Sequence, residues 1–210
     1  MAASAQPTNL VRVVGLCGSL RPGGHTRKVV NLALAGSREV GAEVALLDLA
    51  DYELVFCDAR DDESTYPADV HHLRAEVAAA DGIILGTPEY HSGVSGVLKN
   101  ALDLMGFSQF GGKMIGLVGV SGGVMGATNG LSNLRTIGRS LHAWVVPEQV
   151  SVARAGDAFN ADGGLIDAKL DAAVRNVGAQ VARFAFLHSS DHPREFLRLW
   201  EESQANPGGD

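Results

Sequence analysis

Short apolar segments alternate with amphipathic segments along most of the chain. The apolar segments are near-continuous runs rich in Val, Ile and Leu, as in strands buried on both faces, and they recur about every 30 to 40 residues, the length of one strand-plus-helix unit. The runs are Leu10–Leu16, Val44–Leu47, Ile83–Leu85, Ile115–Val120 and Trp144–Val146. This pattern predicts five β-strands.

Between these runs, apolar side chains recur at the spacing of one face of an α-helix. The predicted helices are Thr26–Arg38, Ala68–Ala80, Val97–Met105, Leu131–His142 and Leu165–Leu187. Strands that alternate with helices indicate a parallel sheet with right-handed crossovers and helices on both faces. The sequence therefore predicts one doubly wound α/β domain over residues 10–188.

The two ends of the chain fall outside this pattern. We expect residues 1–9 to form a flexible arm and residues 189–210 to form a tail with one short helix, Pro193–Ser203. Phe196 and Trp200 share a face of that helix, and we expect them to pack on the core of their own subunit. A contact with another subunit is the alternative, because Trp is enriched at interfaces.

Composition narrows the class of protein. The chain has 210 residues, of which 46% are hydrophobic, and this excludes disorder as its overall state. A net charge of −7 without runs of Lys and Arg argues against partners such as nucleic acid or a membrane surface. Cys17 and Cys57 lack the C-x-x-C spacing of a zinc ribbon, and two cysteines do not make a disulfide framework. Without a membrane-spanning run or a secretory signal, we expect a soluble cytoplasmic protein.

The first candidate site is the loop Gly18–Thr26, which follows the first strand. Ligands of open parallel sheets bind outside the carboxyl ends of the strands. A phosphate there would meet free N–H groups, the positive end of a helix dipole, hydroxyl groups and an arginine. The candidate residues are Ser19, Arg21, Gly24, His25 and Thr26. Because P-loop and dinucleotide spacings are absent, the loop predicts a monophosphate site, with Asp48 as a turn residue. The alternative is an ordinary turn with Thr26 as helix N-cap.

The second candidate site follows the third strand, at Thr87–Gly96. We expect Pro88 to end the strand, so that the N–H groups of Glu89, Tyr90 and His91 lack ladder partners and face a ligand with carbonyls and ring nitrogens. The candidate residues are Pro88, Glu89, Tyr90, His91, Ser92 and Gly93. A role of His91 as general base is the alternative to a role in orienting the ligand.

The third candidate site is the glycine-rich loop Ser121–Gly126, after the fourth strand. Glycines at a strand end indicate close approach of the backbone to a flat ligand, and the candidate residues are Ser121, Gly122 and Gly123. The same segment matches the G-x-S-x-G elbow of serine hydrolases. That alternative requires His188 and one of three acids, Asp157, Asp162 or Asp167. No histidine cluster has the spacing of a metal site, so we expect no metal.

Two motifs together resemble the NAD(P)H-dependent FMN reductase family. They are Gly18-Ser19-Leu20-Arg21 followed by Thr26-Arg27, and Thr87-Pro88-Glu89-Tyr90 running into Leu98-Lys99-Asn100-Ala101-Leu102-Asp103. The resemblance covers roughly residues 10–185 and implies a flavodoxin-like sheet of five parallel strands in the order 2-1-3-4-5. It also implies that Ser19, Arg21 and Thr26 hold the FMN phosphate. Residues Pro88–Gly93 would then line the isoalloxazine ring, and Ser121–Gly126 would close over its other edge.

The resemblance further implies an enzyme that passes hydride from NADPH or NADH through bound FMN to a quinone, free flavin or similar small acceptor. No side-chain catalyst is required, because the flavin carries the chemistry. Such proteins are commonly homodimers or homotetramers. The chain departs from the family pattern at four positions, Gly24, His91, Gly93 and Ser95. An electron carrier of the flavodoxin type, without nicotinamide turnover, is the other alternative. For an NADPH 2′-phosphate the sequence offers four arginines without ranking them: Arg12, Arg27, Arg135 and Arg139.

Overall fold

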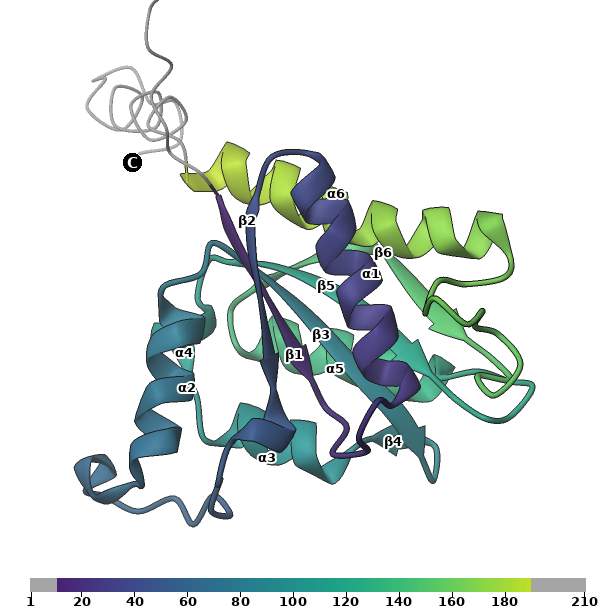
Figure 1. Cartoon of the computed structure of the whole chain (residues 1–210). Helices are drawn as coiled ribbons and strands as arrows, with labels where there is room; N and C mark the ends of the chain where they lie inside the picture. Colours follow the sequence, from purple (N-terminus) through teal and green to yellow (C-terminus); the bar gives the residue numbers. More distant parts are fainter. Residues whose placement is uncertain (1–10, 190–210) are drawn as a thin grey trace, which may run out of the picture.

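Five parallel strands form the centre of the molecule in the order β2-β1-β3-β5-β6 (Figure 1). The computed structural model describes residues 11–189, so the predicted arm at 1–9 and the predicted helix Pro193–Ser203 lie outside the described residues. The parallel strands are β1 (Arg12–Cys17), β2 (Glu43–Asp48), β3 (Gly82–Tyr90), β5 (Met114–Val120) and β6 (Trp144–Val152). Counting these five alone, the order is the predicted 2-1-3-4-5, and the doubly wound fold is confirmed.

Helices cover both faces of the sheet. One layer is α1 (His25–Glu39) with α6 (Ala168–Ser189), which lie side by side in Figure 1. The other layer consists of α2 (Ala68–Ala78), α3 (Gly96–Asp103), α4 (Phe107–Phe110) and α5 (Thr128–Ser140). Two neighbours on β1 show why the strands are apolar throughout: Val13 belongs to the core under α1 and α6, and Val14 to the core on the opposite face.

Glycines allow α1 and α6 to pack at backbone contact. A Cβ atom on Gly36 would lie 1.9 Å from the carbonyl oxygen of Arg175, and one on Gly178 would lie 1.7 Å from that of Ala33. The hydroxyl of Ser37 donates a hydrogen bond to the carbonyl of Gly178 at 2.8 Å. These two glycines therefore serve helix packing and not the candidate site.

Two strands run further than their apolar segments predicted. Pro88 does not end β3 as expected; it lies opposite Val120, and β3 continues to Tyr90. A proline removes only its own N–H, and beyond it the strand gains a new partner, the short antiparallel strand β4 (Gly93–Val94). The last strand includes Pro147, which a register shift opposite β5 accommodates.

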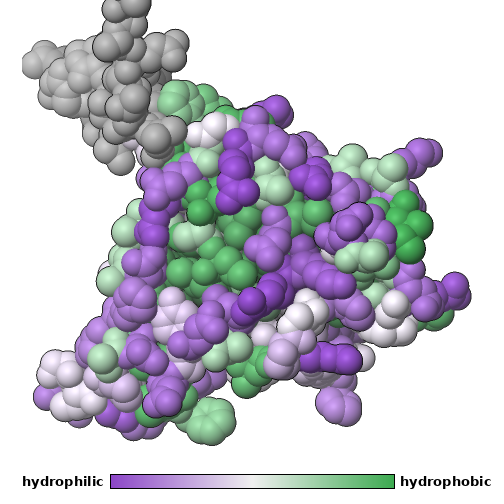
Figure 2. Space-filling view, viewed as in Figure 1, coloured by the Kyte–Doolittle hydropathy of each residue, from purple (hydrophilic) through white to green (hydrophobic). Residues whose placement is uncertain are grey.

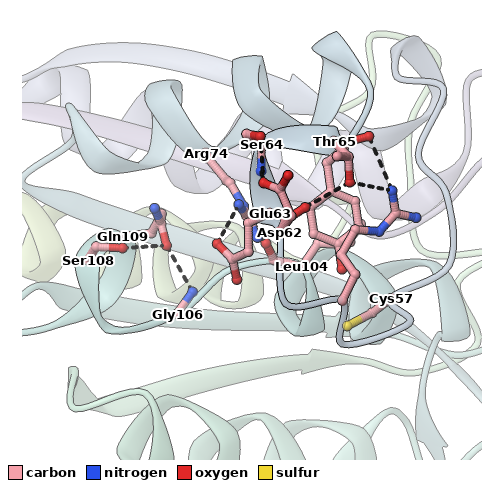
Figure 3. A network of polar contacts seen from close by, with 12 residues as sticks. Cys57, Asp62, Glu63, Ser64, Thr65, Arg74, Leu104, Gly106, Ser108 and Gln109 are labelled. Atoms are coloured by element: carbon pink, nitrogen blue, oxygen red, sulfur yellow. Dashed lines mark hydrogen bonds and ion pairs between the residues drawn. The ribbon is translucent and has the colours of Figure 1, made fainter.

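A polar network fixes the long connection between β2 and α2 (Figure 3). Arg74 donates to the carbonyl of Leu104 at 2.6 Å and to Glu63 at 2.9 Å. The ring of Tyr66 lies under two guanidinium groups, with Arg60 4.3 Å and Arg74 5.1 Å from its centroid. The N–H of Cys57 donates to the side chain of Asn100 on α3. These contacts hold the connection against the layer of α2, α3 and α4.

The strand β2 is an edge of the sheet. Figure 2, drawn in the orientation of Figure 1, shows apolar side chains gathered over this edge. On β2, Val44 and Leu46 are only partly buried against the core of α1 and α6. Across residues 11–189, every helix is too short or too polar to span a lipid bilayer.

Candidate functional site

The three predicted loops meet at the carboxyl edge of the sheet, around a cleft of about 360 Å³. Most of the predicted residues line this cleft: Ser19, Arg21, Gly24, His25, Thr26, Pro88, Glu89, Tyr90, Ser121 and Gly122. The remaining predicted residues His91, Ser92, Gly93 and Gly123 are not part of its lining. Three residues that sequence reasoning missed complete the wall: Val120, Ala155 and Gly156. Two of these lie after β6, whose carboxyl end reaches the same edge as the others.

The first loop leads into a helix that has no side-chain cap. Gly24 is the N-cap of α1, it makes no capping hydrogen bond, and the first turn contains no acidic residue. The alternative in which Thr26 caps the helix is therefore wrong. Ser19 is nearly buried, and its hydroxyl accepts the N–H of Arg21 at 3.3 Å. Free N–H groups at a helix start, beside a serine and an arginine, form an arrangement that binds an oxyanion.

The charge around the start of α1 is positive although the whole chain carries −7. Within residues 11–189, neither Arg21 nor Lys28 forms an ion pair. Burial lowers the pKa of His25, and the charges of Lys28 and Arg21 lower it further. A doubly charged anion placed there would neutralise this cluster. These residues fit the phosphate of a nucleotide cofactor.

Three of the four arginines considered for a 2′-phosphate are already engaged. Arg12 is paired with Glu76, Arg27 with Asp48, and Arg135 donates to the side chain of Gln149 and to two carbonyls of β6. Arg139 lies beside Trp144, the first residue of β6, and so belongs to the amino edge of the sheet. None of the four is thus a free cation at the cleft.

Asp48 has the structural role that the sequence predicted for it. Its carboxylate accepts the N–H of Ala50 at 3.0 Å, which caps the short helix Leu49–Asp51 after β2. The paired guanidinium of Arg27 lies on α1, so the two groups join the end of β2 to the start of that helix. Asp48 is therefore a turn residue, and it does not line the cleft.

The second loop is a tight hairpin between β3 and β4. His91 and Ser92 have φ values of 51° and 61°, as the two central residues of a type I′ turn require. Tyr90 pairs with Gly93 and Glu89 with Val94, so the expectation that this segment lacks ladder partners is wrong. Hydrogen-bonded and non-bonded pairs alternate in an antiparallel ladder, so one of the two residues has an N–H that does not bond to β4. His91 occupies the turn and does not line the cleft, so it is not in position to act as a general base.

Buried hydrogen bonds of Ser95 join the first and second loops. The hydroxyl of Ser95 donates to the carbonyl of Gly18 at 2.6 Å and accepts the N–H of Leu98, which caps α3. Its own N–H donates to Thr87 at 3.1 Å. Ser95 is 2% exposed, so these bonds are shielded from water. Its hydroxyl therefore ties the second loop to the first.

The third loop is fastened to the loop after β6. The N–H of Ser121 donates to Val152, and the N–H of Ala155 returns a bond to Ser121 at 3.0 Å. The N–H of Arg154 donates to the carbonyl of Gly123 at 3.1 Å. The two loops therefore form one continuous wall, which explains why Ala155 and Gly156 line the cleft. The general rule that strand ends share an edge was the signal that could have found them.

The serine hydrolase alternative is contradicted by the fold. Ser121 follows the carboxyl end of β5, whereas the ring of His188 lies 6.1 Å from that of Trp144, the first residue of β6. The two side chains are therefore on opposite edges of the sheet, about 20 Å apart at the usual rise per residue of a strand. Among the described residues, no cluster of His, Cys, Asp and Glu is arranged to hold a metal ion.

The strand order, the uncapped start of α1 and the cleft across the strand ends are the features of a flavodoxin-like α/β protein. Two solved structures share this fold. The flavoenzyme NAD(P)H:(acceptor) oxidoreductase FerB from Paracoccus denitrificans superposes with a TM-score of 0.71 at 23% identity, covering 85% of this chain and 99% of the other. A flavodoxin, WrbA-like protein from Agrobacterium tumefaciens superposes with a TM-score of 0.56 at 22% identity, covering 85% and 98%.

Sequence comparison identifies the family. A model of the NADPH-dependent FMN reductases matches residues 11–157. The FMN-dependent NADPH-azoreductase of Staphylococcus aureus is 32% identical over 191 residues, which cover 87% of this chain and 97% of the relative. The chain therefore belongs to the NADPH-dependent FMN reductase family. It is an NAD(P)H-dependent oxidoreductase with FMN as its cofactor, and the prediction of an enzyme is confirmed.

Proposed function

We propose that the cleft at the carboxyl edge is the FMN site and that the phosphate lies at the start of α1. Ser19, Arg21, Gly24, His25 and Thr26 would hold it. The observation that carries this proposal is the uncapped helix start beside the unpaired Arg21. Two other helix starts at this edge have side-chain partners: the N–H of Gly130 in α5 donates to the carboxylate of Glu89, and Ser95 caps α3.

The isoalloxazine ring would lie across the strand ends, against Pro88–Tyr90 on one side and Ser121 and Gly122 on the other. Ala155 and Gly156 would complete the wall of the site, and the sequence did not predict these two residues. His91, Ser92, Gly93 and Gly123 would support this site through the backbone turns that they form. FMN, when bound, supplies hydride acceptance and donation, so the protein contributes position, fixed dipoles and exclusion of water.

A flat, largely apolar acceptor fits the mouth of the cleft, and we propose a quinone, free flavin or an azo compound. Five large apolar side chains at this edge are more than half exposed: Leu20, Phe56, Tyr90, Val124 and Met125. A groove of about 430 Å³ continues past Tyr90 and is lined mainly by apolar groups, including Leu20, Leu49 and Phe56. The Staphylococcus aureus relative is named for azo reduction, which supports this class of acceptor.

The same exposed side chains support a homodimer or homotetramer, in which a second copy would cover part of the mouth. Exposed apolar clusters of this kind are common at subunit contacts. We further propose a cytoplasmic location, since Cys17 and Cys57 are both free thiols, as in a reducing compartment. Light scattering measures the molar mass of the purified wild type and of the Phe56→Asp variant, and the comparison tests the proposed assembly. A monomeric wild type would contradict it.

Turnover with defined substrates tests the reaction. The purified protein is expected to show a flavin absorbance spectrum and to oxidise NADPH or NADH when a quinone, an azo dye or free FMN is added. Stopped-flow reduction of the bound flavin by each nicotinamide gives the preference between them. A colourless protein that takes up no added FMN would contradict the proposed site, and a flavin that neither nicotinamide reduces would contradict the proposed reaction.

A further inference from the structure

An aromatic stack stands directly behind the wall of the cleft. His25 lines the cleft at the first residue of α1. Its imidazole is parallel to the ring of Phe159, with the ring centroids 5.1 Å apart and the planes within 1°. The ammonium group of Lys28, one turn along α1, lies 5.2 Å from the centroid of the same ring. Phe159 itself does not line the cleft.

The loop that carries Phe159 is held in place by its own contacts. This loop, residues 153–167, follows β6 and contributes Ala155 and Gly156 to the cleft. Phe159 forms a bridge with Leu165, and the N–H of Ile166 donates to Ala158 at 3.0 Å. Ala155 and Leu165 are buried in the core of α1 and α6, and Phe159 packs against that core. The ring of Phe159 is therefore a fixed surface and not a free side chain.

We propose that Phe159 is a positioning residue for the cofactor phosphate, which acts by holding the imidazole of His25 toward the start of α1. This inference rests on the proposed phosphate site. A histidine near a helix start has several rotamers, and only some of them point an N–H at a bound anion. A parallel ring that covers one face of the imidazole selects among these rotamers before the phosphate arrives, which lowers the entropic cost of binding.

The surroundings of His25 lower its pKa. The causes are burial and two neighbouring cations, Lys28 on α1 and Arg21 on the first loop. Phe159 adds an uncharged ring from the loop after β6. A dianionic phosphate at the helix start would offset both cations and favour the imidazolium form. Binding of the phosphate would then be coupled to uptake of a proton at His25.

A double-mutant cycle on FMN affinity tests the inference without reference to turnover. The variants are Phe159→Leu, His25→Ala and the two together, with FMN affinity measured by quenching of flavin fluorescence on titration of apoprotein. Phe159→Leu keeps an apolar side chain but removes the flat ring. An aromatic pair contributes about 0.5–1.5 kcal/mol, so we expect FMN to bind about 2- to 12-fold more weakly to Phe159→Leu. In the His25→Ala background the same substitution is expected to have no further effect.

Two further variants separate positioning from packing. Phe159→Tyr retains the flat ring and is expected to bind FMN as the wild type does. Ile166→Ala changes a residue of the same loop that is 66% exposed and serves as the matched control. Equal weakening by Phe159→Leu with and without His25, or no weakening at all, would overturn the inference.

The proposed phosphate site is tested separately in the same titrations. Normal FMN affinity in Arg21→Ala, or no FMN binding by the wild type, would overturn the site and the inference together. A loss of affinity in Arg21→Ala combined with additive effects in the cycle would overturn only the role of Phe159.

Discussion

The carboxylate of Glu89 accepts a hydrogen bond from the N–H of Gly130 at 2.7 Å. Glu89 is near the end of β3, and Gly130 is in the first turn of α5, so this bond fastens the second loop of the cleft to the start of a helix. A carboxylate at that place also satisfies a free N–H group and interacts favourably with the helix dipole. Glu89, which also lines the cleft, thus uses its side chain as a helix cap.

We expect Glu89→Ala to lower the free energy of unfolding by about 1–2 kcal/mol, the usual loss on removal of a helix cap. Glu89→Gln keeps an oxygen acceptor but loses the charge, and it should lose about half as much. Urea denaturation of the apoprotein measures both. Glu148→Ala, at an exposed position of β6, is the control, and equal stabilities of the Glu89 and Glu148 variants would contradict the capping role.

Arg21→Ala should weaken FMN binding about 10- to 100-fold, since a charge-assisted hydrogen bond contributes about 1.5–3 kcal/mol. The loss should appear with FMN and be absent with riboflavin, which lacks the phosphate. Fluorescence titration of both flavins gives the comparison. Arg139→Ala, at the opposite edge of the sheet, is the matched control. A parallel loss of riboflavin affinity in Arg21→Ala would place the arginine elsewhere than at the phosphate.

The affinity for FMN should depend on pH through His25. The pKa of this histidine is lowered in the free protein, and a bound phosphate favours the protonated form and so raises it. The affinity that His25 contributes by taking up a proton is therefore fully present below its pKa in the free protein and is lost as the pH rises through its higher pKa in the complex. The ratio of FMN dissociation constants for His25→Gln and wild type, measured between about pH 5 and pH 9, should fall toward one. A ratio that stays constant would show that His25 does not titrate against the phosphate.

Gly178→Ala should destabilise the protein strongly, because its Cβ would lie 1.7 Å from the carbonyl oxygen of Ala33 in α1. Forcing the two helices apart typically costs about 1–3 kcal/mol or more. Gly96→Ala is the matched control: Gly96 is also helical, a Cβ there meets nothing within 4 Å, and α3 should tolerate it. Thermal unfolding of the two variants is the measurement, and similar midpoints would contradict close packing of α1 on α6.

Much of the architecture could be inferred from local pattern. Runs such as Ile115–Val120 are apolar at every position because both faces of the strand are buried, and this alone indicates a doubly covered parallel sheet. The loops that follow such strands share one edge by geometry, so Ser19, Pro88 and Ser121 could be placed in one cleft without coordinates. The length of β3 was harder to predict from the sequence. Proline is unfavourable within strands, which suggested an end at Pro88, and β4 is too short to show a hydrophobic pattern.

The hairpin at His91 and Ser92 illustrates the limit of local reasoning. Neither residue is a typical I′ turn residue, and the positive φ values follow from the pairing of β3 with β4. His91 and Ser92 occupy the turn and are not part of the cleft lining, and their role in cofactor binding stays a prediction.

Hydrophobic periodicity and the chemistry of three loops were readable in the linear chain, since burial and backbone preference act on neighbouring residues. Three contacts could not be inferred from the linear sequence. They are the hydrogen bond from Gly130 to Glu89, the ion pair of Arg27 with Asp48, and the stack of His25 on Phe159. Each joins residues from different strand–helix units, and their meeting depends on how α1, α5 and the last loop pack on the sheet. Those contacts determine which charged groups remain free to receive a ligand.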